Sequence, residues 1–324
     1  MKIKIGFIGC GGIANAHMTS LAKIKEAEFA AFCDIAGEKA EQAAKTYGGK
    51  AYTDYWKMLD IERLDACYIC VPPFGHNGQE ELCIEKGIPF FVEKPVELNL
   101  KKAHAISKMV REKNLITSVG YILRYVDVVD KAGEFLKGRE IAMVRGKYFG
   151  AVPGDGKGWY SQKKLSMGQL VEQATHTVDM MRYLAGDISE VFAYMFDGIN
   201  NKLYEKYDVE DASVVAMKFK NGAIGSLACT WLWTGCGSGV EIFCKNLILT
   251  YEGMSLTVAE GNGTTTYTST TDRGLAEHTA FVRAVRKNDR SLIRSNYEDG
   301  VKTLEVSLLA HASREKGVPV RISG

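Results

Sequence analysis

The first third of the chain alternates short apolar runs with segments of mixed polarity. The apolar runs lie at residues 3–8, 29–33, 66–71, 88–92 and 116–119. The segments between them have the apolar spacing of helices, which predicts crossover connections and a parallel sheet. We therefore expect residues 1–120 to form a doubly wound α/β domain. Its helices are predicted near 38–47, 79–86 and 100–113, with a short strand near residue 51.

The pattern changes after residue 120, where strands follow one another with few helices between them. Such spacing is typical of an antiparallel sheet. We expect residues 121–324 to form an α+β domain on a mainly antiparallel sheet, with a helix near 298–315 that packs back on the first domain. The predicted strands are 141–149, 188–196, 212–219, 223–233, 240–243, 247–251 and 255–258. The predicted helices are 125–137, 169–184, 275–287 and 298–314.

The strand at residues 188–196 is apolar on both of its faces. Phe192, Tyr194 and Phe196 alternate with Val191 and Ala193. A sheet with one face in water should alternate more cleanly between apolar and polar residues. We predict that a second subunit covers the outer face, in a homodimer or homotetramer formed through this sheet.

A glycine-rich turn joins the first strand to a segment with helical spacing. Gly9 permits a tight turn, and Gly11 has no Cβ to block a phosphate. Ala14 is small where the helix must pack closely on the strand, and Gly12 and Ile13 complete the turn. A turn and helix N-terminus in this arrangement bind pyrophosphate, so these five residues are predicted to bind a dinucleotide.

Asp34 ends the second apolar run, where an acid accepts hydrogen bonds from the adenosine ribose. A 2′-phosphate would meet this carboxylate directly. The residues that follow supply no arginine, and Lys39 is the nearest cation. NAD is therefore favoured over NADP as the cofactor.

The bulk composition is that of a globular enzyme. A chain of 324 residues is long enough for two domains with cores. Its 41 basic and 39 acidic residues leave a net charge of +2, which does not indicate a nucleic-acid or membrane partner. The first strand begins at Ile3 and no run reaches membrane-spanning length, so neither a signal peptide nor a membrane segment is predicted. Cysteines in apolar strands, including Cys67 and Cys70, are interpreted as reduced structural thiols of a cytoplasmic protein.

Ligands of parallel sheets bind beyond the carboxyl ends of the strands. Pro72, His76, Glu93 and Lys94 follow two of the predicted strands, so we expect them near the cofactor, although a helix start also explains His76. Removal of a hydride from a carbinol leaves a proton for a base, and a cation or donor must hold the oxygen. Lys94 is a candidate to contact both the nicotinamide ribose and a substrate hydroxyl.

His176 is the second candidate for proton transfer, because the ordinary pKa of histidine is near neutrality. On the helix predicted over residues 169–184, Glu172 at i−4 and Asp179 at i+3 share its face. One acid could fix the imidazole tautomer, although a solvated polar stripe explains the same spacing. Whether Lys94 or His176 is the primary base is open.

Several further residues are weaker candidates. His17 is interpreted as an interface or capping residue, and no metal site is predicted. The remaining histidines without partnered spacing are His104, His278 and His311. The candidates to line a polyol pocket, each also explained by packing, are Tyr121, Arg124, Trp159, Tyr160 and Thr175.

Four segments together resemble the family of glucose–fructose oxidoreductase and inositol dehydrogenase. They are GCGGIA at 9–14, VEKP at 92–95, VGYILRY at 119–125 and EQATHTVD at 172–179. The resemblance covers essentially the whole chain. It implies a Rossmann domain, an open-faced sheet domain, and oxidation or reduction of a sugar, cyclitol or polyol carbon with NAD(P) by a dimer or tetramer. It also implies a cis Lys94–Pro95 bond and a catalytic acid–histidine pair at Glu172 and His176, although many members have Asp rather than Glu at the first position.

Two other functions fit the same residues. The first is a glycosidase of this fold, in which bound NAD oxidises the sugar transiently, allows elimination and returns the hydride. The second is a non-enzymatic NAD-binding regulator, which would be expected to lack Lys94 or His176. Both residues are present, so the dehydrogenase is preferred.

Overall fold

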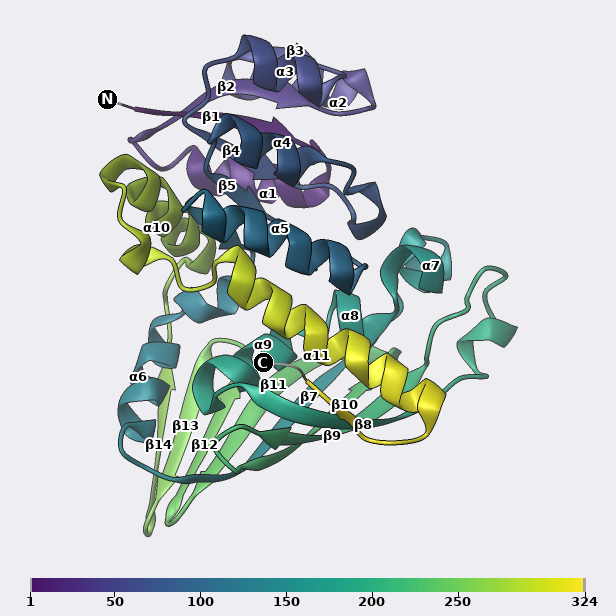
Figure 1. The fold of residues 1–324 in the computed structure, drawn as a ribbon. Helices are drawn as coiled ribbons and strands as arrows, with labels where there is room; N and C mark the ends of the chain where they lie inside the picture. Colours follow the sequence, from purple (N-terminus) through teal and green to yellow (C-terminus); the bar gives the residue numbers. More distant parts are fainter. Residues whose placement is uncertain (1, 323–324) are drawn as a thin grey trace. The chain divides into compact units, whose positions relative to one another are not determined.

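The computed structural model describes residues 2–322, which form two compact units (Figure 1). The first unit holds the chain up to Tyr125 together with Asp272–Val301. The second holds Val126–Thr271 and the chain from Lys302 onward. Each unit is built around its own sheet. The first unit therefore consists of two segments that are far apart in the sequence.

The first unit contains six parallel strands in the order β3-β2-β1-β4-β5-β6. The winding direction reverses between β1 and β4, which makes the carboxyl ends of these two strands the topological switch point of the sheet. The predicted doubly wound α/β fold is confirmed. The strands are β1 (Ile3–Ile8), β2 (Ala27–Cys33), β3 (Lys50–Tyr52), β4 (Ala66–Ile69), β5 (Phe90–Val92) and β6 (Thr117–Val119).

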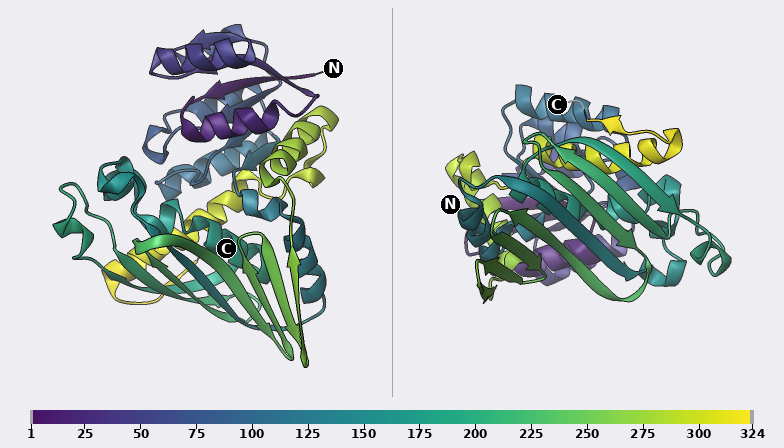
Figure 2. Two further views of the ribbon diagram at one scale, coloured as in Figure 1. Left: turned by 180° about the vertical axis from the view of Figure 1, so that it is seen from behind. Right: turned by 90° about the horizontal axis from the view of Figure 1, so that it is seen from below.

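Helices cover both faces of this sheet. α1 packs with α10 on one face, and α3, α4 and α5 follow one another on the other (Figures 1 and 2). The sequence pattern did not predict α3, whose first turn is capped by the Asp54 carboxylate through the amides of Trp56 and Lys57. The helices are α1 (Gly12–Leu21), α2 (Gly37–Tyr47), α3 (Tyr55–Ile61), α4 (Gln79–Lys86), α5 (Leu100–Glu112) and α10 (Arg273–Lys287), with the short 3₁₀ turns η1 (Pro73–Gly75), η2 (Ile122–Tyr125) and η6 (Arg290–Leu292).

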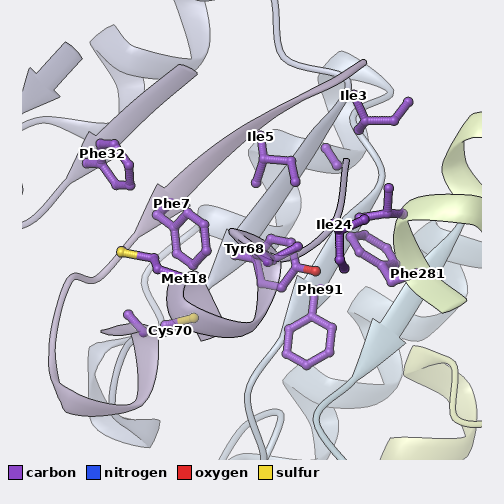
Figure 3. Packing of buried hydrophobic residues seen from close by; sticks show 14 of the residues in the cluster. Ile3, Ile5, Phe7, Met18, Ile24, Phe32, Tyr68, Cys70, Phe91 and Phe281 are labelled. Carbon is purple, nitrogen blue, oxygen red and sulfur yellow. The ribbon is translucent and has the colours of Figure 1, made fainter. Parts of the chain in front are cut away.

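An aromatic core joins the sheet of the first unit to α1 and α10 (Figure 3). Tyr68 of β4 stacks between Phe7 of β1 and Phe91 of β5, with ring centroids 4.9 and 4.8 Å from its own. Met18 of α1 and Phe281 of α10 are fully buried in the same cluster. This packing fixes the start of α1 relative to the strand ends.

The second unit contains a nine-stranded sheet in the order β14-β13-β12-β11-β7-β10-β9-β8-β15. Neighbouring strands are antiparallel except β10 and β7, so the predicted mainly antiparallel sheet is confirmed. The run at 223–233, predicted as one strand, is divided at Trp231, and β14 was not predicted because its residues are polar and exposed. The strands are β7 (Ile141–Ala151), β8 (Ile188–Phe196), β9 (Ala212–Phe219), β10 (Ile224–Thr230), β11 (Leu232–Cys244), β12 (Leu247–Glu252), β13 (Ser255–Glu260), β14 (Gly263–Thr268) and β15 (Val320–Arg321).

Helices cover one face of this sheet. α9 packs so closely on β7 that a Cβ on Gly146 would lie 2.6 Å from the Met181 sulfur. α11 begins in the first unit, where the Tyr297 amide donates to Thr117 Oγ1 at 3.0 Å, and continues into the second. The remaining helices are α6 (Asp127–Leu136), α7 (Lys163–Ser166), α8 (Gln169–Glu172), α9 (Thr175–Ala185) and α11 (Tyr297–Lys316), with the 3₁₀ turns η3 (Pro153–Gly156), η4 (Trp159–Ser161) and η5 (Asn200–Lys202).

The other face of this sheet carries exposed apolar side chains. Val191 and Ala193 of β8 are buried beneath the helices, whereas Tyr194 and Phe196 are 69% and 53% exposed. Tyr194 pairs across the strands with the exposed Val214, so both lie on the same face. In the right-hand view of Figure 2 this face is turned toward the viewer, with the helices of the second unit behind it.

Across residues 2–322, no helix combines the length and apolar character needed to cross a membrane. In the same part of the chain, no three His, Cys, Asp or Glu side chains are grouped so that they could hold a metal ion.

Candidate functional site

The glycine turn after β1 has the geometry that a bound pyrophosphate requires. Gly9 has φ +89°, and a Cβ there would lie 2.5 Å from the Cys70 carbonyl oxygen, so only glycine fits. A Cβ on Gly11 or Gly12 would meet no atom within 4 Å, which leaves the outer side of the turn open. Ala14 is fully buried in the core of the unit. The turn therefore exposes its backbone, while the buried Ala14 anchors α1 in the core of the unit.

Asp34 is fixed by the backbone of that same turn. Its Oδ2 accepts from the Cys10 amide at 2.8 Å, and its Oδ1 accepts from the Ala36 amide at 2.9 Å. Each oxygen keeps a second lone pair for a ligand. Burial, reinforced by the Asp34 charge, raises the pKa of the Cys10 thiol to about 12. Cys10 therefore stays protonated, and its contribution is the amide that orients Asp34.

A hollow of about 260 Å³ lies at the end of β3, between the starts of α2 and α3. Glu41, Tyr52, Asp54 and Lys57 are among its lining residues. In a doubly wound sheet this edge receives the adenosine half of a dinucleotide. The hollow thus presents two carboxylates and one ammonium group to a ligand.

His76 follows Pro72 and η1 at the end of β4, and its side chain lies in the interior. Its Nδ1 pairs with Glu80 one helical turn later, in a buried contact. Burial acts to lower the pKa of His76, but the Glu80 carboxylate more than offsets this effect and the pKa is raised. His76 therefore holds the loop between β4 and α4, and its contact with a cofactor stays a prediction.

Lys102 joins two loops at this edge of the sheet. Its Nζ donates to the His76 carbonyl oxygen at 3.0 Å and pairs with Glu97 Oε2 at 2.8 Å. The other oxygen of Glu97 accepts from the Leu98 amide at 2.8 Å. Sequence reasoning did not find this connection, because a lysine one turn into an amphipathic helix carries no local signal.

Lys94 is the second residue after β5, and the Lys94–Pro95 bond is cis, as the resemblance implies. The Lys94 amide donates to Glu93 Oε2 at 3.1 Å, and Glu93 Oε1 lies 2.7 Å from His17 Nε2. His17 also contacts His278, at 2.9 Å between ring nitrogens. The interpretation of His17 as an interface or capping residue is therefore wrong: its ring is buried. His278, which has no partnered spacing in the sequence, is its spatial partner.

Two predicted pocket residues, Tyr121 and Arg124, lie in the first unit and are buried. The Arg124 guanidinium pairs with Asp299 Oδ2 at 2.5 Å and donates to the Arg294 carbonyl oxygen at 2.5 Å. These contacts hold the segment that leads into α11. The assignment of both residues to a substrate pocket stays a prediction.

The helix predicted over residues 169–184 is broken in the second unit. The Ala174 amide donates to the Gln169 carbonyl oxygen, five residues back, and the His176 amide donates to Gln173, three residues back. The Gln173 side chain accepts from the Trp231 indole at 2.8 Å and stabilises the break. A wide turn followed by a tight one replaces the regular i, i+4 ladder. The expectation that Glu172 lies one regular turn before His176 is therefore wrong.

α8 and α9 nevertheless present the predicted residues. Glu172 and Thr175 are buried, and His176 is half-buried. Asp179 accepts from Thr303 Oγ1 at 3.1 Å, and Thr303 in turn accepts from Arg182 at 2.7 Å. These bonds attach α9 to α11, a role for Asp179 that the sequence did not indicate. The other predicted pocket residues of this unit, Trp159 and Tyr160, are half-buried and stacked with ring centroids 3.9 Å apart.

Glu210 supports the start of α8 from below. Its Oε1 accepts from the Leu170 amide at 3.2 Å, and its carboxylate occupies the space that a Cβ on Gly168 would need. Burial raises the pKa of Glu210 to about 7. Sequence reasoning missed this residue, which lies 38 positions from Glu172 and in no motif.

Comparison with known proteins places these features in a family. Residues 3–121 match the model of an oxidoreductase family with an NAD-binding Rossmann fold, and residues 139–250 match the GFO/IDH/MocA C-terminal domain. The chain is 28% identical over 251 residues to glucose-6-phosphate 3-dehydrogenase of Bacillus subtilis, covering 74% of this chain and 71% of that protein. It is 27% identical over 233 residues to scyllo-inositol 2-dehydrogenase (NAD(+)) of the same organism, covering 70% and 66%.

The fold is also that of solved structures. Levoglucosan dehydrogenase in complex with NADH superimposes with a TM-score of 0.89 at 21% identity, over 100% of both chains. At this identity the likeness concerns the fold alone. Together, the two matched family models and the similar dehydrogenases establish that the chain belongs to the Gfo/Idh/MocA family of oxidoreductases with an NAD-binding Rossmann fold.

Proposed function

We propose that this chain is an NAD-dependent dehydrogenase that moves a hydride between nicotinamide and a secondary alcohol or ketone carbon of a sugar, cyclitol or related polyol. One observation carries the proposal: an accessible glycine turn and Lys94 lie at the carboxyl edge of one parallel sheet, in one unit. The sugar-phosphate and inositol dehydrogenases among its relatives support the substrate class.

The residues of the first unit fit a bound dinucleotide. The open outer side of the turn at Gly11 suits a pyrophosphate, and Asp34 keeps lone pairs for ribose hydroxyls. A 2′-phosphate on a ribose bound by Asp34 would meet that carboxylate, and a phosphate in the neighbouring hollow would meet those of Glu41 and Asp54. Since Lys57 is the one cation lining that hollow, repulsion exceeds attraction, and NAD is preferred to NADP.

Proton transfer and oxygen stabilisation are assigned to two side chains. When bound, nicotinamide accepts or returns the hydride. We assign the hydroxyl proton to His176, whose ordinary pKa suits a group that both accepts and releases a proton. We assign stabilisation of the developing oxygen charge to the ammonium of Lys94. Glu172 is assigned to orient the imidazole or to accept from a substrate hydroxyl.

Three residues of the second unit are assigned to the substrate. Trp159 and Tyr160 form a stacked aromatic surface that suits the C–H face of a sugar ring. Thr175 is assigned to hydrogen bonding with hydroxyl groups. The Glu at position 172 makes this acid one methylene longer than Asp, so the substrate is expected to differ from those of members with Asp.

The open sheet face supports a homo-oligomer. Tyr194, Phe196, Val214 and Ile224 are exposed on it, and soluble proteins usually bury such a patch against a partner. The expected state is a homodimer or homotetramer formed through this face.

The decisive experiment is a screen of sugars, cyclitols and their phosphates with NAD and with NADP, followed by NADH or NADPH absorbance. We expect a polyol or sugar that supports continuous NADH formation. If the protein retained its cofactor and released a sugar product without net formation of NADH, it would be a glycosidase instead. Cofactor binding without any turnover would contradict the proposal.

A further inference from the structure

A chain of buried polar groups crosses the core of the first unit. His17 of α1, His278 of α10 and Tyr68 of β4 are all buried, and so is Glu93, which follows β5. His17 Nε2 lies 2.7 Å from Glu93 Oε1, and His17 Nδ1 lies 2.9 Å from His278 Nε2. His278 Nδ1 lies 3.3 Å from the Tyr68 hydroxyl. One chain of hydrogen bonds thus links four separate segments of the sequence.

Burial sets the protonation of two groups in this chain, His278 and Tyr68. Burial, reinforced by His17, lowers the pKa of His278 well below its ordinary value, so that ring is neutral and has one N–H. Burial raises the pKa of Tyr68, which keeps its proton. The Glu93 carboxylate can only accept, so His17 donates through Nε2. With Tyr68 donating to His278, His278 donating to His17 and His17 donating to Glu93, every ring nitrogen in the chain is satisfied.

The chain ends on the backbone of Lys94. Glu93 Oε2 accepts from the Lys94 amide at 3.1 Å, while Oε1 faces His17. Gly120, at the end of β6, leaves room for this carboxylate, because a Cβ there would lie 2.7 Å from Glu93 Oε1. Both oxygens of Glu93 therefore have hydrogen-bond partners, and contacts with His17, Gly120 and the Lys94 amide fix the plane of its carboxylate.

Packing alone does not account for these polar groups. The rings of His17 and His278 contact Phe91 edge-on, a contact that apolar side chains of similar size would also make. Burial of four polar groups costs free energy unless all are paired, and apolar replacements are often neutral or stabilising. Unlike apolar contacts, the hydrogen bonds of this chain are directional. They therefore specify one orientation of the Glu93 carboxylate and hence of the Lys94 amide.

We propose that His17 is a positioning residue, which fixes Glu93 and thereby holds the backbone of Lys94 in register with α1, the helix that follows the pyrophosphate turn. The inference rests on the proposed function, because Lys94 is assigned to the reacting oxygen there. Its consequence is that the candidate cofactor helix and the candidate reacting residue are joined by side chains rather than by sheet hydrogen bonds alone. Misplacement of a reacting group by about 1 Å can cost about 100-fold in rate.

The test compares His17→Leu with His17→Gln, whose amide can still donate to Glu93, and with Thr19→Ala, an exposed change on the same helix. We expect His17→Leu to lower kcat about 10- to 100-fold and to leave the Kd for NADH, measured by its fluorescence, within about threefold. His17→Gln should recover most of the lost kcat, and Thr19→Ala should match the parent.

Hydrogen exchange supplies a readout that needs no substrate. In His17→Leu, amides in peptides covering residues 90–99 should exchange faster than in the parent, while those of β1 and α2 stay unchanged. Equal acceleration throughout the first unit, or no change at residues 90–99, would overturn the positioning role. A parent that binds NADH but turns over no sugar or polyol contradicts the proposed function, and the exchange result still decides the role of His17.

Discussion

The two units support their candidate residues in different ways. In the first unit, Gly11, Asp34 and Lys94 each follow a parallel strand, and the end of that strand sets their position. In the second unit, Glu172 and His176 lie on two short helices packed across a sheet, and side chains from distant segments hold those helices. The glycine turn and Asp34 depend mainly on the backbone at the strand ends, whereas the residues on the broken helix depend on buried side chains. Away from the His17–Glu93 contact, the first unit's residues should therefore tolerate substitutions of their neighbours better than those of the second.

The largest effect is expected at the proposed reacting groups. Lys94→Ala and His176→Ala should each lower kcat about 100- to 10,000-fold, because loss of acid–base or electrostatic help costs that much. Both should leave the Kd for NADH within about threefold. Lys101→Ala and His104→Ala, which change exposed side chains of the same types, should match the parent. Near-parental turnover in either reacting-group variant would remove its assignment.

The second effect concerns the support beneath α8. The pKa of Glu210 is about 7 in the folded protein against an ordinary 4.5, so the folded state holds this proton more tightly. Stability should therefore fall as pH rises from about 4.5 to 7, by up to about 3 kcal/mol from this group. Glu210→Gln should remove that part of the slope in urea unfolding at pH 5, 6 and 7.5.

The matched control for this change is Glu205→Gln, an exposed residue for which the same slope should persist. Equal pH slopes in the parent and in Glu210→Gln would mean that this carboxyl is not the group that titrates. The dependence of α8 on this buried carboxyl would then no longer distinguish the second unit from the first.

The smallest effect is expected at the adenosine side of the first unit. The parent should bind NAD more tightly than NADP, and Asp34→Ala should narrow that gap about tenfold by removing the nearest negative charge. Because the strand end sets the turn, the variant should keep the parental melting temperature within a few degrees. Titration of both cofactors by fluorescence or calorimetry provides the check. Equal affinity of the parent for both cofactors would contradict the assignment to NAD.

The features that local spacing determines could be predicted from the sequence. A strand, a glycine turn and the start of a helix lie within residues 3–14, and Asp34 follows at the end of the next strand. The parallel sheet, the mainly antiparallel sheet and the family were predicted for the same reason: each depends on periodicity or on short motifs.

Features that depend on distant segments could not be predicted in this way. His17 and His278 are 261 residues apart, so nothing in either neighbourhood indicates the other. The break at Gln173 depends on the Trp231 indole, and the local sequence reads as one continuous helix. Glu210 and Lys102 escaped notice for the same reason. In the sequence each is an ordinary charged residue, and only the folded structure shows the buried group that it contacts.

The division of the first unit into two segments has a consequence for synthesis. Phe281 and His278 complete the packing around Tyr68 and Phe91, yet they leave the ribosome after strands β7 to β14 of the second sheet. A nascent chain that ends at residue 125 therefore has all six parallel strands but an uncovered aromatic patch. The nucleotide-binding unit, although encoded first, can therefore complete its core only after most of the second unit has been synthesised.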